Sequence, residues 1–193
     1  MMKFLKVATI ALLGFAFAPN QLEAQMNIDT ERSVIKWVGK KVTGEHSGTI
    51  NVKEGYLTFE GEELIGGKVV VDMNSIVCSD LDAESGAKLV GHLKSDDFFG
   101  VDKHPTATFV ITNVASRGET GDYKVTGELQ IKGIKKTQKV NARVGAGKGA
   151  KVNITIDRSD FNIRYGSGSF FDNLGDKTIY DEFDLMMTLR LQG

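Results

Sequence analysis

The chain has 193 residues, enough for one ordinary domain, and 24 lysines and arginines balance 25 aspartates and glutamates to a net charge of -1. This near-neutral charge provides no strong basic field, so nucleic-acid binding is excluded as a function. The single cysteine, Cys78, excludes an internal disulfide and a cysteine-based zinc site.

The N-terminal residues resemble an export signal. Lys3 and Lys6 precede an apolar run over 7–18, which is shorter than the roughly 20 residues that a membrane-spanning helix needs. Ala24 then offers a small residue where a signal peptidase would cut; an uncleaved anchor is the alternative. We therefore predict a periplasmic or secreted protein without an integral membrane segment in its mature part, divided into a signal peptide over 1–24 and one domain over 25–193.

The first half of the predicted domain alternates apolar and polar residues with the period of β-strands. Glycines predict a turn over 44–48, a hinge at Gly55 and a turn at Gly66–Gly67. The strands expected from this pattern cover 33–42, 46–53, 56–60 and 69–73.

A short helical insert interrupts the strands. Leu89 and Leu93 stand four residues apart, so one face of a short helix is apolar. Ser95, which two acidic residues follow, is expected to cap a second helical turn that carries Phe98 and Phe99. We expect this segment to close one end of the strand assembly.

The second half returns to strand patterns, with the longest alternating run at the C-terminus. These strands are expected over 106–115, 123–131, 134–144, 152–156 and 183–191. The fold class is therefore all-β with a short helical insert, built from about eight antiparallel strands. Such strands form either a sandwich or a closed barrel, and a barrel of this size is either filled by side chains or holds one small ligand.

Few residues suggest chemistry. His46, His92 and His104 lack the close spacing of a metal site, so we predict no metal. We also predict no catalytic residue. The enzymatic alternative would place His46, His92 or Asp97 at a barrel mouth as acid or base, and it requires two of these groups within hydrogen-bond reach of each other.

Five segments, in this order, resemble the YceI family: Gly44–Gly48, Gly91–Phe99, Lys103–Phe109, Thr126–Gly133 and Asp157–Ile163. The resemblance implies a secreted bacterial protein with an antiparallel lipocalin-like β-barrel. It also implies a polyisoprenoid or similar long-chain amphiphile inside the barrel, of the isoprenoid quinone or prenyl phosphate type, carried or stored without catalysis. No other cofactor is implied. The likeness to lipocalins concerns shape alone, because Ile35 and Lys36 precede Trp37 where lipocalins have a Gly-x-Trp start.

The expected ligand contacts are the apolar residues assigned to the dry strand faces. They are Trp37, Val71, Phe98, Phe99, Phe109, Ile111, Leu129, Ile131, Ile154, Phe161, Ile163 and Met187. Arg158 is a further candidate, which we expect to pair with Asp160 in solvent or, if it faces the mouth, with a polar head group.

Two alternatives concern the assembly. A barrel packed solid would indicate a structural or stress-related envelope protein instead of a carrier. A homodimer is expected only if the long C-terminal strand lies at an open sheet edge, where it could pair with a second copy.

Overall fold

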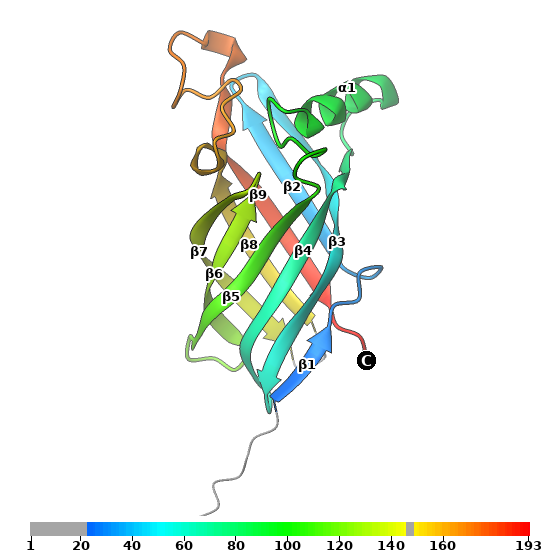
Figure 1. Ribbon diagram of the computed structural model, residues 1–193, viewed down its shortest axis with the longest axis vertical. Coiled ribbons are helices and arrows are strands. Elements are labelled where there is room, and N and C mark those ends of the chain that lie inside the picture. The colour runs from blue at the N-terminus through cyan, green and yellow to red at the C-terminus, as the bar shows by residue number, and fades with distance from the viewer. Residues whose placement is uncertain (1–22, 146–148) are drawn as a thin grey trace, which may run out of the picture.

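The computed structural model describes residues 23–145 and 149–193, and Figure 1 shows a tall barrel of strands with a helix at its upper end. The strands are β1 (Glu23–Asn27), β2 (Val34–Lys41), β3 (Gly44–Glu60), β4 (Glu63–Cys78), β5 (Thr106–Ser116), β6 (Asp122–Ile131), β7 (Ile134–Gly145), β8 (Gly149–Asp157) and β9 (Ile179–Arg190). The helical elements are α1 (Ala83–Lys94), η1 (Arg158–Phe161) and η2 (Gly175–Lys177).

The strands form one antiparallel sheet that closes on itself. Their order is β1-β3-β2-β9-β8-β7-β6-β5-β4, and the pairing of β3 with β4 completes the circle. β1 pairs with the far end of β3, and the bridge between Ile28 and Leu191 continues its line toward β9. Because β1 and β2 thus occupy one position of the wall, the barrel has eight strands. The all-β class with a helical insert is confirmed, and the sandwich alternative is wrong.

The C-terminal strand β9 lies between β2 and β8. It is therefore not at an open sheet edge, so this strand cannot pair with a second copy in the way that the predicted homodimer requires. The dimer itself stays a prediction.

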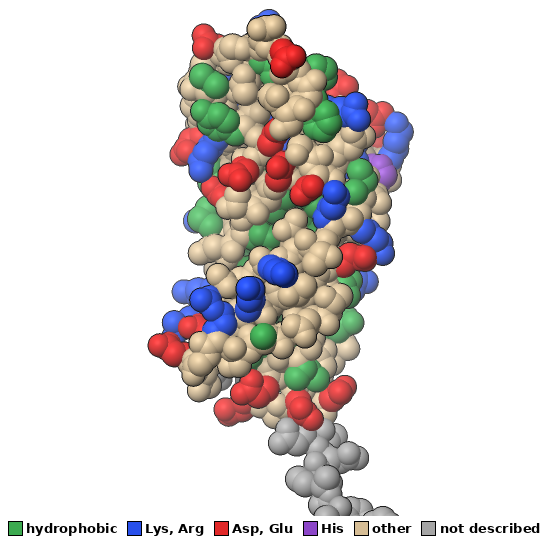
Figure 2. All heavy atoms as spheres, turned by 90° about the vertical axis from the view of Figure 1, so that its left-hand side faces the viewer, with side chains coloured by type: hydrophobic (Ala, Val, Ile, Leu, Met, Phe, Trp, Pro, Cys, Tyr) green, Lys and Arg blue, Asp and Glu red, His purple; other side chains and the backbone are tan. Residues whose placement is uncertain are grey.

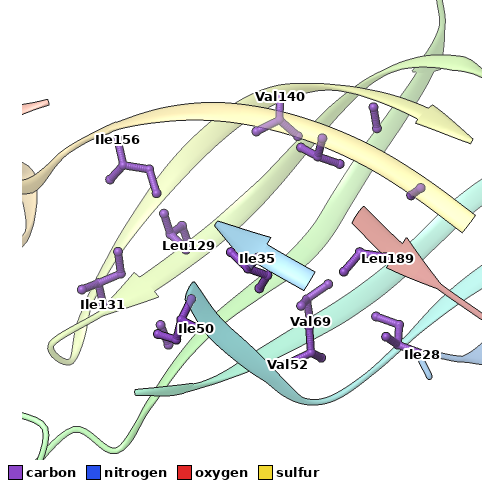
Figure 3. Packing of buried hydrophobic residues seen from close by; sticks show 14 of the residues in the cluster. Ile28, Ile35, Ile50, Val52, Val69, Leu129, Ile131, Val140, Ile156 and Leu189 are labelled. Carbon is purple, nitrogen blue, oxygen red and sulfur yellow. The ribbon is translucent and has the colours of Figure 1, made fainter. Parts of the chain in front are cut away.

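Alternation along the strands sorts side chains between the interior and the solvent. In β6, for example, Tyr123 and Val125 are buried, whereas Lys124 between them is exposed. Figure 3 shows buried side chains from several strands turned toward one another inside the barrel. On the outer face in Figure 2, acidic and basic side chains are intermixed, and several apolar side chains lie near the upper end.

Two glycine-based turn predictions are wrong. The 44–48 segment belongs to β3, and Gly66–Gly67 lies within β4. A Cβ on Gly48 would lie 2.7 Å from Trp37 Cζ2, and one on Gly67 would lie 2.8 Å from Leu57 Cδ2. These glycines therefore permit close packing inside strands, where a turn was expected.

The strand also continues through Gly55, where the sequence predicted a hinge. A Cβ at this position would lie 2.6 Å from the carbonyl oxygen of Lys68. The glycine therefore allows the neighbouring strand to approach, and the pairing irregularity between Val52 and Glu54 lies just before it.

The helical insert differs from its prediction in one respect. Asp82 caps the start of α1, since its side chain accepts hydrogen bonds from the backbone of Glu84 and Ser85. Ser95 ends this helix, and its hydroxyl donates to the carbonyl of His92 at 2.8 Å. Because Ser95 is used in that way, it caps no second helical turn, and Phe98 follows in a hydrogen-bonded turn.

The N-terminal predictions fall mostly outside the described residues. Residues 1–22 are not among them, so the signal peptide stays a prediction. Cleavage after Ala24 would leave Gln25–Asn27 paired with Tyr56–Thr58 of β3. Within the described ranges, no helix is long and apolar enough to cross a membrane.

Asp80 fastens the segment that leads into α1 to the start of β3. Its carboxylate accepts the Ser47 backbone N–H at 2.9 Å, lies 2.9 Å from His46 Nδ1, and accepts from the Cys78 thiol at 3.2 Å. The Ser47 and His46 hydrogen bonds lower the pKa of Asp80 from 3.8 to about 2. The ionised form is therefore the one that stabilises the fold.

We predict that Asp80→Asn reduces the pH dependence of stability. A depressed carboxyl pKa stabilises the fold above the unfolded pKa, and this contribution is lost as pH falls from about 4 to about 2. The gap in unfolding free energy between wild type and Asp80→Asn should therefore shrink over this range in urea titrations. The exposed Asp102→Asn serves as control. A gap that is independent of pH would contradict the assignment.

Candidate functional site: an apolar cavity in the barrel

The barrel is hollow. The centre of a water-sized sphere can reach about 190 Å³ of its interior, whereas one water molecule needs on the order of 10–15 Å³ of such space. The residues around the cavity come from β2 to β9 and from the helical insert. The interior is thus not packed solid, which removes the structural premise of the packed-barrel alternative.

The cavity is long and nearly uniform in chemistry. Its lining residues on β9 run from Ile179 to Leu189, a path of about 30 Å along the strand. Apolar atoms make up almost the whole wall. Lys40, Thr108 and Arg158 are among the few polar residues that contribute to it.

Aromatic side chains concentrate toward the α1 end of the cavity. The rings of Phe98 and Phe99 meet edge to face with centroids 5.0 Å apart, and Phe99 approaches Phe183 at 6.3 Å. Lys132 holds this turn in place, since its ammonium donates to the carbonyls of Asp96 at 2.8 Å and Phe98 at 2.7 Å. The opposite end is bounded by smaller residues. The helical insert therefore covers one end of the barrel.

Most of the predicted ligand contacts surround this cavity. They are Trp37, Val71, Phe98, Phe99, Phe109, Ile111, Leu129, Ile131, Ile154, Arg158 and Met187. Phe161 and Ile163 do not line it, although both are completely buried. The reason is that η1 follows β8 directly, so the period of two ends at Asp157 and the next apolar residues pack elsewhere in the core. Contact of any of these residues with a ligand stays a prediction.

The prediction missed many lining residues that share the inward face with those it named. Among them are Ile35, Ile50, Leu57, Val69, Met73, Leu93, Val125, Val140, Val152, Ile156, Phe183, Leu185 and Leu189. The signal was present for most of them, because residues two positions apart on a strand face the same side. The polar lining residues Lys40, Thr108 and Tyr180 carried no such signal.

Arg158 is buried, contrary to its expected place in solvent. Arg158 is 2% exposed, and its guanidinium Nη2 lies 3.1 Å from Oδ1 of Asp181. The expected partner, Asp160, instead pairs with Lys136 at 3.2 Å. The pairing prediction is therefore wrong, because η1 turns Arg158 inward and leaves Asp160 on the surface.

The remaining donors of Arg158 are also engaged. The guanidinium donates to the carbonyls of Ile163 at 2.9 Å, Ile179 at 3.0 Å and Tyr180 at 3.2 Å, and it lies 5.4 Å from the centre of the Phe98 ring. Burial lowers the pKa of Arg158, and Asp181 opposes that shift. The side chain thus joins η1 to the start of β9, and few of its donors are left for a head group.

The residues of the enzymatic alternative do not come together. His46 bonds to Asp80, His92 packs edge to face on Tyr165 with centroids 4.3 Å apart, and Asp97 is exposed. His46, His92 and Asp97 do not line the cavity, so the paired groups required at its mouth are not formed by these side chains. In the part of the chain that the structure describes, no three His, Cys, Asp or Glu residues gather as metal ligands.

Comparison with known families agrees with this architecture. Residues 26–191 match the family model of the YceI-like domain. The chain belongs to the YceI-like family. The resemblance inferred from the five sequence segments is therefore confirmed.

Several known proteins are similar in sequence. A UPF0312 protein of Pectobacterium carotovorum is 35% identical over 125 residues, which cover 60% of this chain and 62% of that protein. A UPF0312 protein of Shewanella denitrificans is 36% identical over 102 residues, which cover 52% of this chain and 51% of that protein. The matched part thus spans less than two thirds of these relatives.

Solved structures share the fold. BcnA of Burkholderia cenocepacia superimposes with a TM-score of 0.63 at 24% identity, over 84% of this chain and 98% of that one. A polyisoprenoid binding domain from Saccharophagus degradans gives a TM-score of 0.59 at 16% identity, over 86% and 97%. At these identities the likeness concerns the fold.

We predict that Arg158→Leu lowers the free energy of unfolding by about 3–5 kcal/mol, because it removes the cation beside Asp181 and the donor to buried carbonyls. Arg143→Leu, which removes an arginine whose side chain is 67% exposed, should change stability by no more than about 0.5 kcal/mol. Urea unfolding of both variants measures the difference. Equal losses would contradict the structural role of Arg158.

Proposed function

We propose that this YceI-like protein binds a polyisoprenoid or similar long-chain amphiphile inside its barrel, as a carrier or store outside the cytoplasm. The observation that carries the proposal is the long apolar cavity. The family assignment and the polyisoprenoid binding domain with the same fold support this class of ligand. An isoprenoid quinone or a prenyl phosphate is the type of molecule that we expect.

Burial of hydrocarbon is sufficient for binding. Each buried CH2 group contributes about 0.8 kcal/mol, so a tail of about fifteen carbons would contribute on the order of 12 kcal/mol before losses. Association and ordering offset several kcal/mol of this, and micromolar affinity needs about 8 kcal/mol. A hydrocarbon tail is also narrow, so a long and thin cavity can accommodate it.

The polar groups of the wall favour binding without a reaction. Lys40 pairs with Asp184 at 3.0 Å, and Arg158 pairs with Asp181 at 3.1 Å. A general acid or base must instead reach the reacting group and exchange its proton. Since both cations are engaged in ion pairs and the rest of the wall is almost entirely apolar, we assign the protein a binding role.

Trp37 provides a direct test of the proposal. It is the single tryptophan of the chain, it lines the cavity, and its indole N–H donates to the Val77 carbonyl at 3.1 Å. We expect geranylgeraniol to change its fluorescence in a saturable manner, with one molecule per chain and a dissociation constant of about 1 μM or lower. A shorter apolar alcohol, geraniol, should bind more weakly. An emission spectrum that geranylgeraniol leaves unchanged, together with no heat in calorimetry, would contradict the proposal.

A substitution at the end opposite α1 should discriminate by chain length. Ala142 is buried and lines the cavity, so Ala142→Leu shortens the available path. Loss of about two buried carbons corresponds to about tenfold weaker binding of geranylgeraniol, whereas geraniol should be affected less. Ala115→Leu, at an exposed position of β5 outside the lining, is the control. An equal effect on both alcohols would count against end-on filling of the cavity.

A further inference from the structure

The wall of the barrel is interrupted between β2 and β9, which run side by side toward the upper end in Figure 1. Gly39 pairs with Phe183, but Lys41 pairs with Ile179. Three residues of β9 therefore face the single residue Lys40 on β2. Such a bulge leaves part of the hydrogen-bond ladder unformed and bends the bulged strand.

The bulge is the place where lining residues of the cavity are exposed to solvent. Among the lining residues in the described part of the chain, only Lys40 and Tyr180 are exposed. The exposed fraction is 51% for Tyr180 and 45% for the Lys40 side chain. One of these residues lies on each side of the interruption, so we take the bulge as the candidate opening of the cavity.

Gly39 keeps this opening clear. It continues the inward-facing series of Ile35 and Trp37 and lines the cavity. A Cβ placed on Gly39 would meet no atom within 4 Å. The neighbouring space is therefore empty, and any larger side chain at this position would extend into it.

A second irregularity of the wall is covered. β3 and β4 shift register between Thr49 and Asn51. There the Ser75 hydroxyl accepts the Asn51 N–H at 2.8 Å, and Lys94 of α1 donates to the Asn74 carbonyl at 2.6 Å. Hydrogen bonds and the helix thus close the wall at this point. At the bulge between β2 and β9, Arg158 engages the Ile179 and Tyr180 carbonyls and Lys40 pairs with Asp184, while Lys40 and Tyr180 remain exposed.

Among the residues that the structure describes, those at the two ends of the barrel offer no comparable route. At the α1 end, the turn of Phe98 is held by the two hydrogen bonds from Lys132, and Phe98 is buried. At the other end, the lining residues Ala142, Ala150 and Leu189 are buried as well. Entry at either end would require these packed residues to separate.

We propose that the hydrocarbon tail enters and leaves the cavity sideways, through the opening between β2 and β9, and that Gly39 and Tyr180 set the rate of this exchange. The proposal rests on the proposed function, since it assigns the route of the ligand bound there. It predicts that side chains at the opening change rates of exchange much more than they change affinity.

Gly39→Phe tests the route, with geranylgeraniol as the probe and Trp37 fluorescence in stopped flow as the readout. Gly145→Phe is the matched control, because a Cβ there also meets no atom within 4 Å and Gly145 does not line the cavity. We expect the association rate constant to fall at least about tenfold in Gly39→Phe and to stay unchanged in Gly145→Phe. Equal rates in wild type and Gly39→Phe would overturn the route alone. Absence of binding by wild type would overturn it together with the proposed function.

Tyr180→Ala supplies the opposite change and removes an exposed side chain, so it should fold even if Gly39→Phe does not. Association and dissociation should both become faster by a similar factor of about three or more, with the dissociation constant within about twofold of wild type. Tyr165→Ala, which removes an exposed tyrosine outside the cavity lining, should leave both rates unchanged. Rates that are unaffected in Tyr180→Ala, or affected equally in Tyr165→Ala, would overturn the proposal.

Discussion

Closure of the sheet by the pairing of β3 with β4 is the constraint on which the rest of the structure depends. Once the sheet is closed, each strand has one face that water cannot reach freely, and the side chains on that face must be apolar. An eight-stranded barrel lies at the size where side chains either fill the interior or leave room for one ligand. Here valine, alanine and isoleucine at many inward positions leave a cavity along the axis.

Polar interactions are concentrated at the α1 end, where the barrel would otherwise be open. Arg158 joins η1 to the start of β9, Lys132 holds the turn that carries Phe98, and Asp80 fastens the segment before α1 to β3. The charge of each is engaged by neighbouring backbone groups and side chains at that end. The interior is therefore left to apolar contacts, which suits recognition of a chain by its length and width.

The sequence predicted the strands well because alternation reports directly which side chains are inside. The C-terminal run of Phe183 to Leu191, for example, overlaps most of β9, which begins earlier at Ile179, and the inward residues Leu129 and Met187 line the cavity. The turn predictions failed at Gly48 and Gly67, which permit close packing inside strands. A single sequence does not distinguish a glycine that permits close packing from a glycine that forms a turn. Arg158 was misplaced because its burial depends on η1, which brings together carbonyls that are distant in sequence.

Native mass spectrometry of the protein purified from its own cells tests the central claim most directly, namely that the cavity holds a hydrocarbon chain. The account predicts a population heavier than the polypeptide by the mass of one amphiphile, which organic extraction releases and identifies as an isoprenoid or similar long-chain compound. Protein that carries only its polypeptide mass, under conditions in which added geranylgeraniol remains bound, would contradict the account.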